Sequence, residues 1–176
     1  MRKIIFQLFL VTILVSCSQT EIKKTSYNIL DEKDRAILRD EILEDRFNNL
    51  LPKLMDETDI DMWVVISREY NEDPVIKTML PSVWLNARRR TILVFYRNKE
   101  NNTIEKLAVA RYDVGKSIKS AWNKEKEPNQ WKALNRIIEE RNPKKIGVNI
   151  SKHFALADGL VKTDYDEFVE NLSKSN

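Results

Sequence analysis

The sequence is poor in the residue types that build most metal centres and covalent catalytic sites. It contains one cysteine, Cys17, and one histidine, His153. A structural zinc site needs several such ligands, so the sequence excludes one, together with any site of several imidazoles. A Ser-His-Asp triad would have to use His153, and no serine nucleophile motif accompanies it. We therefore expect His153 to be an ordinary surface or half-buried side chain.

Glycine is also scarce, and neither sign of charge dominates. With only three glycines, the chain has no glycine-rich loop that could cradle a phosphate. It carries 30 basic and 27 acidic residues, and 42% of its residues are hydrophobic. A chain of mixed charge close to neutrality does not favour nucleic acid, so we expect no nucleic-acid partner. The composition is that of an ordinary globular domain.

The first sixteen residues have the features of an export signal. A basic start, Met1–Lys3, precedes an almost wholly apolar stretch at residues 4–15. This stretch is shorter than the roughly 20 residues that a bilayer-spanning helix needs. The sequence Leu-Val-Ser-Cys at residues 14–17 resembles the bacterial lipobox, in which the cysteine receives a diacylglyceryl group before cleavage. We interpret residues 1–16 as a lipoprotein signal peptide and Cys17 as the lipidation site.

Lipid on Cys17 would decide where the protein resides. More than one acyl chain gives stable membrane anchoring. We therefore expect the protein to be exported and to bind the membrane through this lipid anchor. Ser18 favours the outer membrane, on its periplasmic or surface side. Residues 17–30 are polar and read as a tether, and residues 31–173 as one domain without disulfides. Removal of Arg2 and Lys3 with the signal leaves 28 basic against 27 acidic groups.

The order of elements in the domain predicts an α/β fold with a mixed β-sheet flanked by helices. Apolar runs of strand length and stretches of helical periodicity alternate along the chain. We predict strands at residues 61–67, 91–96, 104–111 and 145–150, and helices at residues 31–57, 130–141 and 163–172. Residues 113–128 read as a loop with one helical turn at 118–122, and residues 75–84 as a short irregular or helical piece. Thr163 is the expected cap of the last helix.

The first predicted helix has one apolar face and one proline. Pro52 lies inside the pattern, which predicts a break or kink near Leu51. The residues expected to share the buried face recur at three- and four-residue steps: Ile37, Ile42, Leu43, Phe47, Leu50, Leu51 and Leu54.

A polar segment directly after the first predicted strand is the first candidate site. In α/β sheets, loops at the carboxyl ends of strands commonly bind ligands. Arg68, Tyr70, Asn71 and Asp73 lie in this loop and are candidate contacts for a substrate or a protein interface. A solvated loop held by internal ion pairs is the alternative interpretation.

The run Arg88–Arg90 is a second unusual feature. Three adjacent cations at the start of a buried strand repel one another unless they are paired. Carboxylates of residues 68–73 are candidate partners, and a plain surface cluster is the alternative. Four large apolar residues lie in or near irregular segments and could face a neighbouring domain or a dimer partner, or instead be buried in this domain's own core: Trp84, Leu85, Trp122 and Trp131.

Several stretches resemble the N-terminal domain of Xaa-Pro aminopeptidase-like proteins of the prolidase and creatinase family. The most specific is Glu69–Pro74, within residues 60–74. The supporting stretches are residues 87–95, 111–112, 146–151 and 154–160. Together they cover nearly everything after the tether.

The resemblance implies a two-domain enzyme. Its N-terminal domain is a mixed sheet flanked by helices, and its C-terminal pita-bread domain holds two divalent metals on two Asp, one His and two Glu. Those ligands have no counterpart here, so we assign no catalytic residue, metal ligand or cofactor to this chain. In that family the N-terminal domain helps the enzyme to dimerise and closes over the partner's active site.

We therefore expect a non-catalytic domain that serves in dimerisation or substrate access, as a truncated gene product or a stand-alone module. The expected partners are a second copy of the chain or a metallopeptidase. Two alternatives remain open: a specificity subunit of a split Xaa-Pro peptidase, and a lipoprotein that binds proline-containing peptides.

Overall fold

The computed structural model describes residues 29–173, and the residues from Asp31 onward form one compact unit. The expected signal peptide, Cys17, Ser18 and most of the tether lie outside the described residues. Within residues 29–173, no helix has both the length and the apolarity needed to cross a membrane.

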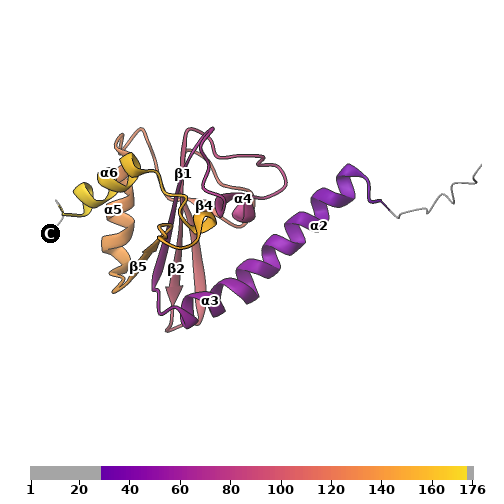
Figure 1. The fold of residues 1–176 in the computed structure, drawn as a ribbon, viewed down its shortest axis with the longest axis horizontal. Coiled ribbons are helices and arrows are strands. Elements are labelled where there is room, and N and C mark those ends of the chain that lie inside the picture. The colour runs from indigo at the N-terminus through magenta and orange to yellow at the C-terminus, as the bar shows by residue number, and fades with distance from the viewer. Residues whose placement is uncertain (1–28, 174–176) are drawn as a thin grey trace, which may run out of the picture. The chain divides into compact units, whose positions relative to one another are not determined.

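The centre of the fold is a five-stranded open sheet of mixed direction, in the order β4-β3-β2-β1-β5 (Figure 1). β1 pairs antiparallel with β2 and parallel with β5, while β3 pairs antiparallel with β2 and parallel with β4. The strand bounds are β1 Met62–Arg68, β2 Arg90–Asn98, β3 Thr103–Val109, β4 Lys119–Ser120 and β5 Ile146–Val148. The predicted mixed α/β sheet, with its hairpin, is confirmed.

Both faces of the sheet are covered, which explains the unbroken apolar runs of β1 and β2. Alternate residues of β1 point to opposite faces: Val64 and Ile66 pack into one hydrophobic cluster and Val65 into the other. The first cluster includes Leu134 and Ile137 of helix α5 (Gln130–Arg141) and also residues of helix α6 (Lys162–Ser173). The second includes the helices before β1 and helix α4 (Ile76–Met79).

The predicted break at Pro52 is present as a change of helix type. α2 (Glu32–Asp45) passes into a π-helical turn, Arg46–Leu50, and then into α3 (Leu51–Glu57). Proline lacks the N–H that would bond one turn back, and its ring crowds that turn's carbonyl. A π-helical turn just before Pro52 accommodates the proline without ending the helical path.

The predicted buried face of this helix is partly wrong. The buried side chains are Leu43, Phe47, Leu51 and Met55, at strict four-residue steps. The structure instead leaves four of the predicted residues about half exposed: Ile37, Ile42, Leu50 and Leu54. Leu43 is the only buried residue of α2, so most of that helix lies beyond the core. The apolar periodicity of α2 therefore does not predict which of its side chains are buried.

α5 has the predicted bounds because both ends carry strong local signals. The Asn129 side chain accepts hydrogen bonds from the backbone N–H groups of Trp131 and Lys132. At the other end Asn142 adopts a left-handed conformation with φ 44°, and Pro143 follows it. The helix therefore ends where Asn-Pro predicts.

Two local predictions are wrong. The expected helical turn at residues 118–122 is the edge strand β4, because Ser120 is held extended by hydrogen bonds with Asp113 and the Ala110 carbonyl. Thr163 does not cap the last helix, since α6 already begins at Lys162. Its first turn instead contains Asp164, whose side chain is fully buried.

Candidate functional site

The loop after β1 is a tight turn whose predicted contact residues do not converge. The Asn71 N–H donates to the Arg68 carbonyl at 3.1 Å, and between them Tyr70 adopts a left-handed φ of 67°. The Tyr70 side chain is 90% exposed and Asn71 is exposed as well. These two residues are available to a partner but do not form a site with Arg68 and Asp73.

Asp73 is fully buried and holds neighbouring segments together. Its carboxylate accepts hydrogen bonds from the Val75 N–H and the Asn149 side-chain amide, both at 2.7 Å. Asn149 in turn accepts from the Trp63 indole at 2.7 Å. Burial raises the pKa of Asp73, and the two hydrogen bonds oppose that rise. Gly159 lies so close that a Cβ there would be 2.5 Å from Oδ2 of Asp73.

Arg68 and Arg90 share one buried carboxylate, that of Asp164 on α6. Arg68 donates to it through Nε at 2.8 Å and Nη2 at 2.7 Å, and Arg90 Nη2 lies 2.9 Å from Oδ1. Arg90 also stacks over the Trp131 ring at 4.7 Å. Carboxylates of residues 68–73 were candidate partners for the Arg88–Arg90 cluster, but none of them forms an ion pair with it in the described chain. Arg90 pairs instead with Asp164 of α6.

The same loop does meet the arginine cluster, through the backbone and the carboxylate of Glu69 and the backbone of Arg89. The Glu69 N–H donates to the Arg89 carbonyl at 2.7 Å, and the Arg89 N–H donates to Glu69 Oε2 at 3.0 Å. Arg89 adopts a left-handed φ of 53°, which is unfavourable for a residue with a side chain. Glu69 therefore fixes a strained turn at the start of β2.

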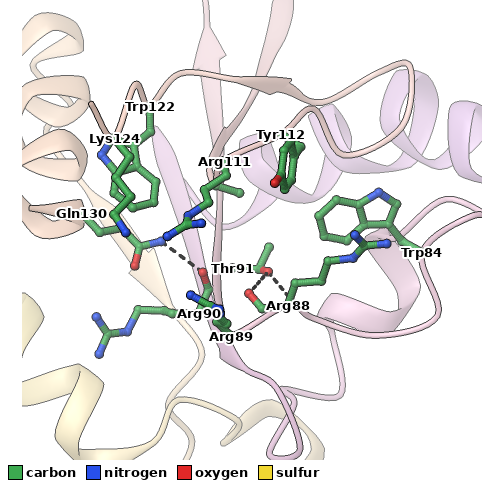
Figure 2. Close-up of a pocket in the computed structure, with 11 residues that line it drawn as sticks. Trp84, Arg88, Arg89, Arg90, Thr91, Arg111, Tyr112, Trp122, Lys124 and Gln130 are labelled. Atoms are coloured by element: carbon green, nitrogen blue, oxygen red, sulfur yellow. Dashed lines mark hydrogen bonds between the residues drawn. The ribbon is translucent and has the colours of Figure 1, made fainter. Parts of the chain in front are cut away.

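A pocket of about 350 Å³ opens beside this turn (Figure 2). It lies among the start of β2, the residues after β3 and the N-terminus of α5. Its lining is rich in cations and aromatic rings: Trp84, Arg88, Arg89, Arg90, Thr91, Ala110, Arg111, Tyr112, Trp122, Lys124 and Gln130. The lining contains no carboxylate and no imidazole. A concave, cationic, partly aromatic surface is suited to binding an anion.

Hydrogen bonds between side chains and the backbone hold the floor of this pocket in place. Gln130, the first residue of α5, donates its side-chain amide to the carbonyls of Arg90 at 3.1 Å and Val109 at 2.6 Å. The Thr91 hydroxyl accepts from the Arg88 N–H at 3.0 Å. The start of β2 and the end of β3 are thereby tied to α5, and the turn before β2 is tied to β2.

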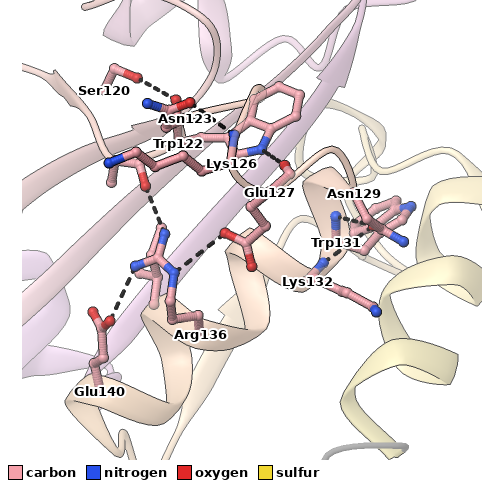
Figure 3. A network of polar contacts seen from close by, with 12 residues as sticks. Ser120, Trp122, Asn123, Lys126, Glu127, Asn129, Trp131, Lys132, Arg136 and Glu140 are labelled. Atoms are coloured by element: carbon pink, nitrogen blue, oxygen red, sulfur yellow. Dashed lines mark hydrogen bonds and ion pairs between the residues drawn. The ribbon is translucent and has the colours of Figure 1, made fainter.

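A polar network holds the Trp122 wall (Figure 3). The Trp122 indole donates to the Glu127 carbonyl at 2.7 Å. The Arg136 guanidinium lies 3.3 Å from the Glu127 carboxylate and 3.1 Å from that of Glu140, and it donates to the Ala121 carbonyl at 2.9 Å. The hydrogen bond from Arg136 lowers the pKa of Glu140. The segment between β4 and α5 is thus anchored to α5, although it has no regular structure.

Groups suited to metal binding do not converge in residues 29–173. No three or more His, Cys, Asp or Glu side chains of this part lie together in a way that could hold a metal ion. His153 is exposed, and its N–H donates to the Ser151 hydroxyl at 3.2 Å.

The sequence pointed to Arg88–Arg90 but missed most of the pocket. Arg111, Tyr112, Lys124 and Gln130 come from segments that meet only in the folded chain. The available signal was the basic-aromatic pair at residues 111–112, one residue beyond the end of β3. Four large apolar residues were expected either to face a partner or to be buried in this domain's own core. Trp84 and Trp131 are buried in the core, Trp122 is partly buried as a pocket wall, and Leu85 is 81% exposed.

No family model, curated protein or solved structure matches the chain.

Proposed function

We propose that this chain is a non-catalytic domain of the creatinase and prolidase N-terminal type. It is anchored by lipid on Cys17 to a bacterial membrane, on the periplasmic or surface side. Its role is to bind and present ligand, or to associate with a metallopeptidase or a second copy of the chain. The domain supplies binding groups, and the chemistry of proline-specific cleavage would belong to a partner.

The observation that supports this proposal is that the buried acids make structural contacts, whereas the cations line the pocket. Asp73 and Asp164, the two fully buried acids of residues 29–173, are committed to structural contacts, while the concave surface presents cations and rings. Hydrolysis needs a general base or an activated nucleophile within reach of the substrate. The pocket lining contains neither a carboxylate nor an imidazole, two of the common general bases, which favours binding over catalysis.

The stretches behind the family resemblance also form one connected structure. Arg68 at the end of β1 pairs with Arg90 at the start of β2 in the antiparallel register. Asn149, after β5, bonds to Asp73, and Gly159 packs against the same carboxylate. Residues that are distant in the sequence therefore meet at one end of the sheet, which supports reading them as parts of one family pattern.

Association is supported by exposed apolar side chains on and near α2. Ile37, Leu38 and Ile42 are each between 43% and 49% exposed, and the nearby segment after α4 adds Val83 at 72% and Leu85 at 81%. Apolar side chains gathered on a surface commonly mark an interface.

An activity assay tests the non-catalytic part of the proposal. The full chain, purified in detergent and supplied with manganese, cobalt or zinc, should release no residue from Xaa-Pro peptides. The control is each metal without protein. Turnover above that control, lost in a His153→Ala variant, would contradict the proposal.

Association is tested in membranes of the producing bacterium. Chemical cross-linking followed by mass spectrometry should join this chain to a metallopeptidase or to itself through α2. If proline-containing peptides raise the midpoint of thermal unfolding while no cross-link forms, the chain is instead a peptide-binding lipoprotein.

A further inference from the structure

The pocket beside the Arg88–Arg90 turn holds a surplus of positive charge. Five of its lining residues are cations, and within residues 29–173 only Arg90 among them has an ion-pair partner, Asp164. Arg111 and Lys124 make no ion pair in the described part of the chain. Like charges gathered around a small concave space repel one another, and a bound anion would relieve that repulsion.

The helix behind the pocket adds to the same field. Gln130 is both a lining residue and the first residue of α5, so the positive end of the helix dipole lies at the pocket. The twelve-residue α5 is held in place by its Asn129 cap and by the Gln130 hydrogen bonds. This contribution is therefore fixed before any ligand arrives.

Aromatic rings form the walls. In Figure 2, Trp122 lies on one side of the pocket with Lys124 and Gln130, and Tyr112 and Trp84 lie on the other. The Arg88 guanidinium stacks over the Trp84 ring at 4.8 Å. Tyr112 is 62% exposed and is free to cover a flat group. Rings and stacked guanidinium groups favour a ligand with a planar apolar part beside its charge.

We propose that this pocket binds a small organic anion in which a doubly charged group, either a phosphate or a pair of carboxylates, is attached to a flat apolar group. Unpaired cations on several segments favour two negative charges over one. The volume of about 350 Å³ lies at the small end of ligand sites and suits a metabolite-sized molecule. This site requires neither a peptidase partner nor proline, so it stands apart from the function proposed above.

Calorimetric titration of the full chain in detergent, at low salt, tests the ligand class. Phenyl phosphate and phthalate each combine a ring with a double charge, whereas benzoate has the ring with one charge and inorganic phosphate has the charge alone. At least one of the first two should bind about tenfold more tightly than both of the others, since each charge-assisted hydrogen bond contributes substantially. Which of the two binds more tightly tells phosphate from dicarboxylate. Equal affinities for all four, or no binding, would overturn the proposal.

Variants place the ligand in the pocket. Arg111→Gln should weaken the tighter probe about tenfold, and Tyr112→Leu should weaken it without changing the affinity for inorganic phosphate. Arg39→Gln on α2 is the matched control, because it removes the same charge from an exposed arginine that makes no ion pair in the described chain. Equal weakening by Arg39→Gln would mean non-specific attraction and would overturn the site. If Arg111→Gln does not fold, Lys124→Gln carries the same test.

Discussion

The guanidinium of Arg68, at the end of β1, donates two hydrogen bonds of 2.8 and 2.7 Å to the fully buried carboxylate of Asp164 on α6. The residues are 96 positions apart, so this contact fastens the last helix to the end of β1. Arg90 reaches the same carboxylate from β2. One acid thus joins three elements at the end of the sheet where the cationic pocket lies.

Replacing Asp164 with asparagine should destabilise the fold. The amide puts an NH2 donor in place of one carboxylate oxygen, so the acceptor of Arg68 Nε is lost, and two arginines lose their counter-charge. We expect a loss of about 1.5–3 kcal/mol in the free energy of unfolding, measured by urea denaturation. The control is Asp166→Asn on the same helix, which removes an exposed pair with Lys162 and should cost less than about 1 kcal/mol. Equal losses in the two variants would show that the shared carboxylate of Asp164 stabilises the fold no more than an exposed ion pair does.

Gly159→Ala should also destabilise the protein, through a clash with Asp73. A Cβ at Gly159 would lie 2.5 Å from Oδ2 and 2.8 Å from Oδ1 of that buried side chain, so the loss should be about 1–3 kcal/mol. In the Gly147→Ala variant the nearest atom is the flexible end of Ile60, at 2.9 Å, so a smaller loss is expected.

A double-mutant cycle tests the cause of the Gly159 effect. Asp73→Ala removes the atoms that the new methyl group would meet, so the double variant should be more stable than the sum of the single effects predicts. Additive losses in urea denaturation would place the strain elsewhere.

The pH dependence of stability should contain a contribution from Asp56. Its hydrogen bond with Arg97 lowers the pKa of Asp56 below 3.8, against the opposing effect of burial. A lowered folded-state pKa gives stability that is present above the ordinary value and is lost as pH falls through the lowered value. Asp56→Asn should therefore flatten the decline of unfolding free energy below about pH 4, by less than about 1 kcal/mol because the side chain is half exposed.

The exposed apolar side chains of α2 should drive association. Light scattering of the full chain in detergent at several concentrations should show a size that grows with concentration. A variant with Ile37→Glu and Ile42→Glu should reduce that growth without lowering the midpoint of thermal unfolding, because both side chains are about half exposed. Growth that persists unchanged in this variant would place the interface elsewhere.

Lipid anchoring can be tested through the single cysteine. Cys17→Ser should abolish labelling by a radioactive fatty acid and leave the precursor uncleaved by the lipoprotein signal peptidase, since the acylated sulfur is what that pathway requires. A serine variant that is processed normally and still partitions into membranes would contradict the lipobox interpretation.

Much of the fold was determined by local sequence. The apolar run at residues 62–66 produced an interior strand because a strand covered on both faces needs apolar side chains on both. Asn142-Pro143 ended α5, and Pro52 interrupted the first helix near Leu51, because these signals act on their own backbone within one turn. The apolar periodicity of α2 gave a wrong prediction of its buried residues where the helix extends beyond the core. An apolar stripe does not by itself show that another element covers it.

The candidate site was decided by the tertiary structure. The sequence singled out Arg68 and Asp73 as neighbours in one polar loop, but folding sends Arg68 to Asp164 and buries Asp73 against Asn149 and Gly159. The pocket gathers side chains from the starts of β2 and α5 and from the segments after β3 and β4, and no local pattern links them. Local propensity reports the backbone conformation of a short segment, whereas a charge acquires its role only when the fold sets its partners and its distance from water.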